Sequence, residues 1–223
     1  MNKLEVNGLS KSFGSRQILK EVSLSLETGD MFGLFGRNGS GKSTLLKCMM
    51  GTLRADALEI KFNGREISAS EVISAKRIGF LPQDPFLPKE MKVRNLIPFI
   101  FPNGEDQDKI FYSPGVAAFD GKIIGTLSAG ELKYLELIIL ANLSHPFLLL
   151  DEPFSMVEPK IIELVKDLLL SLRKTKGLLI TDHYYSDVLE VANRSLLLKN
   201  STLLEVESDD DLAAHEYLKI RKE

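Results

Sequence analysis

Short apolar segments separated by polar turns run along most of the chain. A strand is predicted at Ile18–Leu26, whose second half alternates apolar residues with serines, as in a strand with one buried face. Shorter strands are expected at Leu4–Val6 and Leu58–Phe62, with turn signals at Gly29-Asp30 and Asn63-Gly64. These segments predict an N-terminal antiparallel β-subdomain.

Four other apolar runs lack this alternation, and each ends at polar residues. They are Met31–Phe35, Ile78–Leu81, Phe147–Leu150 and Leu178–Thr181. Continuous apolar strands are typical of a parallel sheet that is covered on both faces. We therefore expect a parallel core sheet.

A helix is predicted between the last two of these runs, because apolar residues recur there with a period of about 3.6 residues. Its expected buried stripe is Ile161, Leu164, Val165, Leu168 and Leu172. Pro159 suits its first turn, and Gly177 follows its expected end. A second helix is expected at Ser43–Met50. The alternation of strands and helices predicts an α/β fold.

The segment from Pro82 to Gly125 breaks this pattern, since it contains six of the nine prolines and several acidic residues. Prolines at this density prevent long helices, so we expect a reduced, irregular helical lobe inserted at about residues 84–126. A short helix is also expected from Glu207 onward. The sequence shows no internal repeat, and residues 1–223 are predicted to form a single domain.

Charge and composition disfavour several classes of protein. A net charge of -3 with scattered basic residues gives no electrostatic footprint for nucleic acid. The first residues lack the order of a signal peptide, and no apolar run approaches the about 20 residues that span a bilayer. The single cysteine, Cys48, cannot form an internal disulfide and is expected in the core. We expect a cytoplasmic protein that reaches the membrane through a partner.

A glycine-rich loop follows the run Met31–Phe35. From Gly36 to Ser43 the residues fit the P-loop pattern of glycine, four residues, and Gly-Lys-Ser. The glycines let backbone N–H groups surround phosphate oxygens, and the next helix directs its positive end at the same anion. Lys42 is expected at the β- and γ-phosphates and Ser43 at Mg²⁺. The expected nucleotide contacts of the loop are Gly36, Asn38, Gly39, Ser40, Gly41, Lys42, Ser43 and Thr44.

Two adjacent carboxylates follow the run Phe147–Leu150. Asp151 is expected in the Mg²⁺ shell, and Glu152 is expected to polarise the attacking water. Consecutive strand residues point to opposite sides, so the two acids can have different roles. A solvated acidic turn is the alternative for this pair in isolation. The P-loop beside them favours nucleotide hydrolysis, although the P-loop motif alone does not distinguish a kinase, GTPase, motor or transporter.

A third motif carries a family resemblance. Leu127-Ser128-Ala129-Gly130-Glu131 resembles the signature Leu-Ser-Gly-Gly-Glu or Gln of the ATP-binding subunits of ABC transporters. The resemblance extends from about Leu4 to Val206, nearly the whole chain. It implies a P-loop NTPase of the ABC-cassette type that binds and hydrolyses ATP. Ser128 and Glu131 also fit a helix capping box, and both interpretations can hold, because a capped helix start is a phosphate site.

The resemblance implies that the signature acts on a second cassette. In the family, two cassettes pair head to tail, so Ser128 and Gly130 of one would contact the γ-phosphate held by the P-loop of the other. Half a site cannot neutralise the transferring phosphoryl group, so we expect a homodimer to form on ATP binding. The family also implies a separate transmembrane subunit, which would hold the protein at the cytoplasmic face of the membrane.

Three further residues resemble family positions. Phe13 resembles the aromatic residue on which adenine stacks, Gln83 the glutamine that senses Mg²⁺ and water, and His183 the switch histidine at the γ-phosphate. ATP and Mg²⁺ are the expected cofactors. The expected catalytic residues are Lys42, Gln83, Glu152 and His183, and the expected Mg²⁺ ligands are Ser43, Gln83 and Asp151.

Three features depart from the family pattern. Ala129 replaces a glycine of the signature, which requires a negative φ at that position. Ser155-Met156-Val157-Glu158 stands where the family usually has Ser-Ala-Leu-Asp. The lobe is shorter and richer in proline than usual, and in the family this lobe receives the membrane subunit.

Two functions are compatible with these residues. The first is energising transport by a separate membrane subunit. The alternative is a soluble ABC-type assembly ATPase, like that of iron–sulfur scaffold complexes, with non-membrane partners. Repair and cohesin-like ATPases are disfavoured because no coiled coil fits between Gln83 and Ser128. Translation-factor cassettes are disfavoured because they carry two cassettes per chain, and the signature and His183 argue against a kinase or GTPase.

Overall fold

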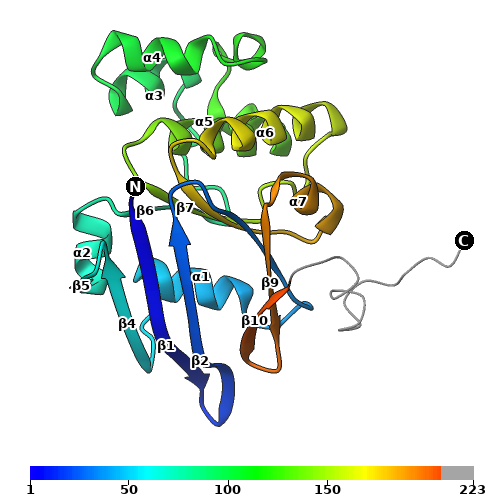
Figure 1. The fold of residues 1–223 in the computed structure, drawn as a ribbon. Coiled ribbons are helices and arrows are strands. Elements are labelled where there is room, and N and C mark those ends of the chain that lie inside the picture. Colours follow the sequence, from blue (N-terminus) through cyan, green and yellow to red (C-terminus); the bar gives the residue numbers. More distant parts are fainter. Residues whose placement is uncertain (207–223) are drawn as a thin grey trace, which may run out of the picture.

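The computed structural model describes residues 1–206, so the helix expected from Glu207 lies outside the described residues. The described chain is an α/β fold with two sheets, and an inserted helical lobe lies at one end (Figure 1). Within residues 1–206, no helix combines the length and apolar character needed to cross a membrane.

The N-terminal segments form a four-stranded antiparallel sheet, as expected. Its strands are β1 (Lys3–Phe13), β2 (Arg16–Glu27), β4 (Ala57–Phe62) and β5 (Arg65–Ile67), in the order β2-β1-β4-β5. Asn63-Gly64 joins β4 to β5 with φ angles of 52° and 79°, which suit a tight hairpin turn. β1 is longer than the strand expected at Leu4–Val6 and continues through three register shifts to the hairpin at Phe13 and Arg16.

A six-stranded sheet forms the centre of the fold, in the order β10-β9-β3-β8-β7-β6. The four continuous apolar runs form β3 (Met31–Phe35), β6 (Ile78–Leu81), β7 (Phe147–Asp151) and β8 (Gly177–Thr181). These strands and β9 (Arg194–Lys199) are parallel, which confirms the expected core sheet. β10 (Thr202–Val206) pairs antiparallel with β9.

Different elements cover the two faces of this sheet (Figure 1). The N-terminal sheet and α1 (Lys42–Met50) cover one face, and α5 (Ala129–Asn142), α6 (Pro159–Leu172) and α7 (Tyr185–Val191) cover the other. Along β7, Leu149 packs on the α1 side, whereas Leu148 and Leu150 pack on the α5 side. Asp151 comes two residues after Leu149 and therefore faces α1.

Helix α6 begins with Pro159, as expected. Val165 of the expected stripe is fully buried, and Leu169, which lies outside that stripe, is fully buried as well. Gly177 does not cap the helix, which ends earlier; it is the first residue of β8. A Cβ at Gly177 would lie 2.6 Å from the carbonyl oxygen of Glu27, so the close approach of this backbone requires glycine.

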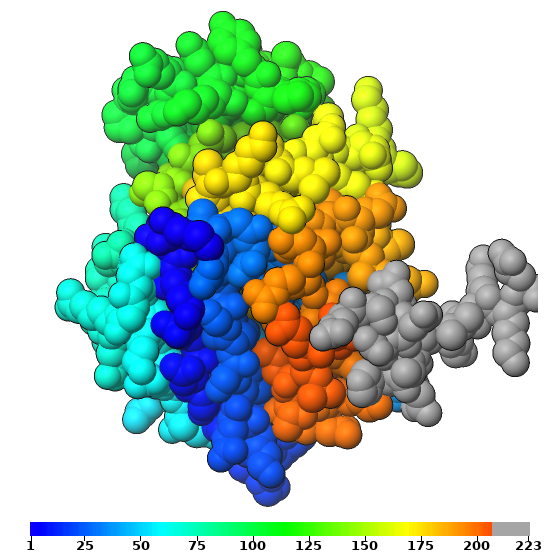
Figure 2. Space-filling view, in the orientation of Figure 1, coloured from blue at the N-terminus to red at the C-terminus, as the bar shows by residue number. Residues whose placement is uncertain are grey.

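The lobe lies between β6 and α5, at the top of the molecule (Figure 1; Figure 2). It contains α3 (Val93–Ile100), α4 (Gly104–Phe111) and the 3₁₀ turns η1 (Val116–Ala118) and η2 (Ile124–Thr126). Its helices are short, as its prolines predict. A bridge between Lys92 and Ile123 closes its base, and its apolar residues share one core with α5. A further short helix, α2 (Ala69–Ser74), packs on α1.

Candidate active site

The P-loop joins the end of β3 to the start of α1. Gly41 is the N-cap of α1 with a φ of 109°, and a Cβ there would lie 2.7 Å from Ile18 Cγ2, so the position requires glycine. The first turn of α1 leaves backbone N–H groups without partners inside the helix. Lys42 Nζ donates a hydrogen bond of 2.6 Å to the Gly36 carbonyl, which holds the ammonium group within the loop.

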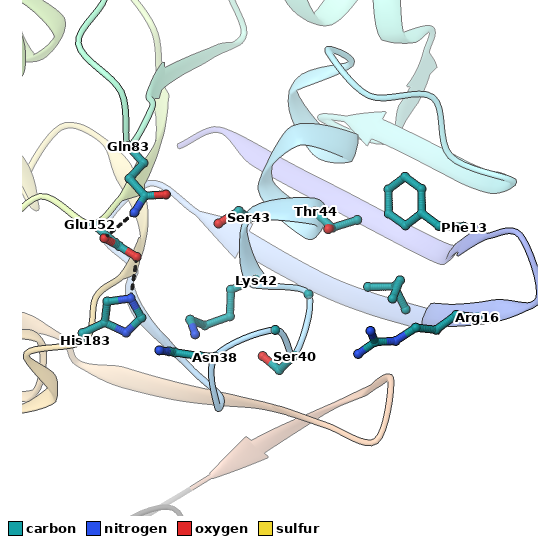
Figure 3. A pocket seen from close by; sticks show the side chains of 13 residues that line it. Phe13, Arg16, Asn38, Ser40, Lys42, Ser43, Thr44, Gln83, Glu152 and His183 are labelled. Atoms are coloured by element: carbon teal, nitrogen blue, oxygen red, sulfur yellow. Dashed lines mark hydrogen bonds and ion pairs between the residues drawn. The ribbon is translucent and has the colours of Figure 1, made fainter.

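A pocket of about 370 Å³ lies in front of this loop (Figure 3). Its lining residues are Phe13, Arg16, Ile18, Asn38, Gly39, Ser40, Gly41, Lys42, Ser43, Thr44, Gln83, Glu152 and His183. All of them except Arg16 and Ile18 were expected site residues. The volume suits a small-molecule ligand. The fold therefore brings together in one cavity residues that are far apart in the sequence.

Lys42 is nearly buried beside this pocket. Burial lowers the pKa of its ammonium group, and the carboxylates of Glu152 and Asp151 oppose that shift. A bound polyphosphate would supply further negative charge at this point and favour the charged lysine.

Asp151 lies behind the P-loop and is 2% exposed. Its Oδ1 accepts a hydrogen bond of 3.2 Å from Ser43 Oγ, which joins the end of β7 to the first turn of α1. Burial raises the pKa of the Asp151 carboxyl, and the Ser43 hydroxyl opposes that shift. Carboxylate and hydroxyl oxygens beside a phosphate loop are the hard ligands that Mg²⁺ takes together with water and phosphate oxygens. The residues present therefore fit this ion.

Glu152 directly follows β7 and has a φ of 59°, in the left-handed region. Its N–H donates to the Thr181 carbonyl at 2.7 Å. Its Oε1 lies 2.7 Å from His183 Nε2, and its Oε2 accepts from Gln83 Nε2 at 3.0 Å (Figure 3). Three expected catalytic residues thus meet around one carboxylate. Glu152 and Asp151 point to different sides because strand residues alternate and also because the backbone at Glu152 has a left-handed φ.

Asp182 was not predicted as a site residue, although it directly follows an apolar strand beside His183. It is 1% exposed and accepts hydrogen bonds from Ser155 Oγ at 3.2 Å and the Tyr184 N–H at 3.1 Å. Ser155 Oγ also lies 3.2 Å from Glu152 Oε2. Burial raises the pKa of Asp182, and these donors oppose that shift. Asp182 therefore fixes the loop after β7 against the loop after β8.

Phe13 and Arg16 are directly paired at the end of the β1–β2 hairpin. Paired residues of antiparallel strands project to the same face, and both side chains line the pocket (Figure 3). The Phe13 side chain is 51% exposed, which suits an aromatic ring that stacks on a ligand base. Arg16 was not predicted, because only the strand pairing places it beside Phe13.

The signature residues lie outside this pocket. Ser128 is the N-cap of α5 and forms the expected capping box with Glu131, with N–H···O distances of 3.1 and 2.9 Å. Ala129 is helical and has no left-handed φ, as its substitution for glycine requires. Neither Ser128 nor Gly130 lines the pocket in front of the P-loop. Ser128 is exposed, whereas Gly130 is buried against α6.

The segment Ser155–Glu158 forms an exposed turn between β7 and α6. Met156 has a φ of 60° and is 82% exposed, which is an uncommon conformation for a residue other than glycine. Glu158 is the N-cap of α6, without a side-chain capping hydrogen bond. Of the three residues that depart from the family pattern here, Met156 and Glu158 are therefore at the surface and Val157 is half-buried.

Comparisons with known proteins agree with this geometry. A family model described as ABC transporter matches residues 19–155. The lipopolysaccharide export system ATP-binding protein LptB of Acidithiobacillus ferridurans is 29% identical over 231 residues, which cover 96% of each chain. The ABC transporter ATP-binding protein YtrB of Bacillus subtilis (strain 168) is 31% identical over 224 residues, or 98% of this chain and 76% of YtrB.

Solved structures show the same similarity. A nucleotide-free ATP-binding cassette from an ABC transporter matches with a TM-score of 0.81 at 25% identity, covering 96% of this chain and 94% of the other. The ADP conformation of an ATP-binding cassette of an ABC transporter matches with a TM-score of 0.80 at 26% identity and the same coverage. These relatives are transporter subunits, which favours transport over the assembly-ATPase alternative.

Proposed function

Because the chain belongs to the ABC transporter family and hydrolyses ATP to power a transporter, we propose that it hydrolyses MgATP as a head-to-tail dimer attached to a separate membrane subunit. The arrangement around Glu152 carries this proposal. Glu152, Gln83 and His183 lie at one end of the pocket, Phe13 lies at the other, and Lys42 lies between them (Figure 3). A nucleotide with its base at Phe13 would have its terminal phosphate beside Glu152.

The proposed roles follow from the contacts of each side chain. Lys42 and the N–H groups of the P-loop bind the phosphates. Glu152 accepts a proton from the attacking water, and Gln83 and His183 orient that carboxylate through their hydrogen bonds. This set places a base and a cation in one pocket (Figure 3).

Mg²⁺, when bound, neutralises phosphate charge. Ser43 and Asp151 would hold it, since their oxygen atoms are already hydrogen-bonded to each other behind the P-loop. Gln83 is the third proposed ligand and would link the ion to the water beside Glu152.

Dimerisation is supported by the position of the signature. Ser128 is exposed at the start of α5 and does not line its own chain's pocket. Free N–H groups at the start of a helix bind anions. Because the start of α5 does not face the pocket of its own chain, the phosphate that it binds would come from another chain. We assign Ser128 and Gly130 to the γ-phosphate held by the P-loop of a second copy.

The membrane subunit is the proposed partner of the lobe, and it would hold the chain at the cytoplasmic face. We also propose that residues 1–223 form one nucleotide-binding domain, because the lobe and α5 share one buried core. Residues of the lobe pack directly on α5, the helix that begins at Ser128. A subunit bound to the lobe would therefore be mechanically connected to the active site.

The Glu152→Gln variant tests this function. It keeps the hydrogen-bonding shape but loses the base, so kcat should fall about 10²- to 10⁴-fold while ATP binding persists. In MgATP this variant should elute as a dimer in size-exclusion chromatography with light scattering. Glu163→Gln, at an exposed position on α6, is the control and should turn over normally. Unchanged turnover in Glu152→Gln would exclude Glu152 as the base, and a monomer in saturating MgATP would contradict the dimer.

A further inference from the structure

Backbone hydrogen bonds do not hold the loop that carries Gln83 in place. From Pro82 to Leu87, its backbone forms no hydrogen bond with the backbone of the other residues among 1–206. A second cavity of about 360 Å³ borders the loop and is lined by Gln83 together with residues of α5. Close packing therefore does not determine the position of Gln83 on this side, and another set of contacts must hold it.

Lys133 of α5 supplies the first of these contacts. Its Nζ donates hydrogen bonds to the carbonyls of Pro82 at 3.1 Å and Gln83 at 3.0 Å. The side chain is nearly buried; burial lowers the pKa of its ammonium group, and the nearby carboxylate of Glu136 opposes that shift. A buried charge needs its hydrogen bonds, so separating Lys133 from these two carbonyls would be costly.

Glu136, one turn further along the same helix, holds the other end of the loop. It is completely buried, and its Oε1 accepts a hydrogen bond of 2.8 Å from the Phe86 N–H. Burial raises the pKa of this carboxyl, and the Phe86 N–H opposes that shift. Residues three apart lie on the same face of a helix, so Lys133 and Glu136 both bond to the loop from one face of α5.

We propose that Lys133 and Glu136 are positioning residues that bind the Gln83 loop to α5 and so make the contact of Gln83 with Glu152 depend on the placement of this helix. This inference rests on the proposed role of Gln83. Ser128 begins the same helix, and Lys133 follows it by about 7.5 Å along the helix axis. Whatever fixes Ser128, including a phosphate held by a second copy, therefore also fixes Gln83.

The rival explanation is that Lys133 only satisfies two buried carbonyl groups. Lys176 provides a matched control for it. Its Nζ donates to the carbonyls of Leu143 at 2.7 Å and His145 at 2.6 Å, and it is also nearly buried with a pKa lowered by burial. Leu143 is the C-cap of α5, so this lysine makes the same kind of contact at the opposite end of the helix.

Hydrogen exchange of the full chain tests the attachment itself. Lys133→Met should loosen the loop and so speed the exchange of the Phe86 amide, which is bonded to Glu136, whereas Lys176→Met should leave it unchanged. Lys133→Arg keeps two donors and should restore most of the protection. Glu136→Leu should expose the Phe86 amide, whereas Glu136→Gln keeps an oxygen acceptor and should not. Equal exchange of the Phe86 amide in Lys133→Met and the unsubstituted chain would overturn the proposal.

Kinetics test the consequence for catalysis. Lys133→Met should lower kcat by about 10- to 100-fold and raise the Mg²⁺ concentration needed for half-maximal rate, because Gln83 is misplaced. Its Kd for ATP without Mg²⁺ should be unchanged. Lys176→Met should lower the Tm by a similar amount but keep kcat. Equal losses of kcat in the two variants would overturn the positioning role. An inactive unsubstituted chain would instead contradict the proposed function, and the exchange comparison would still decide the attachment.

Discussion

The nucleotide pocket and the start of α5 differ in how much of a reaction each can support. The pocket contains the ammonium group of Lys42 and the carboxylate of Glu152, with hydrogen-bonding partners for both. The start of α5 presents an exposed serine hydroxyl and helix N–H groups. The first region is nearly a whole active site, whereas the second, in the proposed dimer, would act on phosphate held by another chain. This division supports the proposal that hydrolysis depends on pairing of two chains.

Removing the cation should affect the pocket most strongly. Lys42→Ala deletes a charge-assisted contact with the phosphates, worth about 1.5 to 3 kcal/mol, so the Kd for ATP should rise about 10- to 150-fold. Isothermal titration calorimetry measures this change. Lys20→Ala, at an exposed position of β2, is the control. An unchanged Kd in Lys42→Ala would place the phosphates somewhere other than the P-loop.

Removing the ring should have a smaller effect, at the other end of the pocket. Phe13→Ala should weaken ATP binding by about 1 to 2 kcal/mol, or about 5- to 30-fold, because a half-exposed ring stacks on the base. Binding of inorganic tripolyphosphate, which has no base, should not change. Phe13→Tyr keeps the ring and serves as the control. Equal weakening of both ligands would show that Phe13 shapes the P-loop instead.

The smallest effect is expected for Arg16. Its exposed guanidinium group extends toward the P-loop beside Phe13 (Figure 3), so Arg16→Ala should weaken ATP and ADP by about 1.5- to 5-fold, the range of exposed ion pairs. The loss should shrink at high salt, and Arg16→Lys should retain most of the affinity. A loss that does not depend on salt would argue against a charge contact.

The parts predicted from the sequence are those encoded by adjacent residues. The P-loop, the capping box of Ser128 and the continuous apolar strands each depend on a short contiguous segment. Gln83 and His183 were expected in the site from the family resemblance, and the structure places them beside Glu152 because parallel strands bring their carboxyl ends to one edge of the sheet.

The missed contacts depend on distant backbone placement. Arg16 enters the pocket through hairpin pairing, and Asp182 joins two loops that follow separate strands. Lys133 donates hydrogen bonds to backbone carbonyls. Every residue has such a group, so the sequence of the loop does not indicate these contacts. Gly177 follows the end of α6, as expected, but its close approach to Glu27 was not predicted because that contact involves a strand far away in the chain.

The most direct test mixes two inactive variants. Lys42→Ala damages the pocket, and Ser128→Arg blocks the start of α5. If the two regions meet across a dimer, each mixed pair has one intact site, so equal mixing should restore about a quarter of the unsubstituted ATPase rate. Mixing Lys42→Ala with Glu152→Gln is the control and should restore nothing, because both changes damage the pocket. No recovery in the first mixture would contradict the shared site.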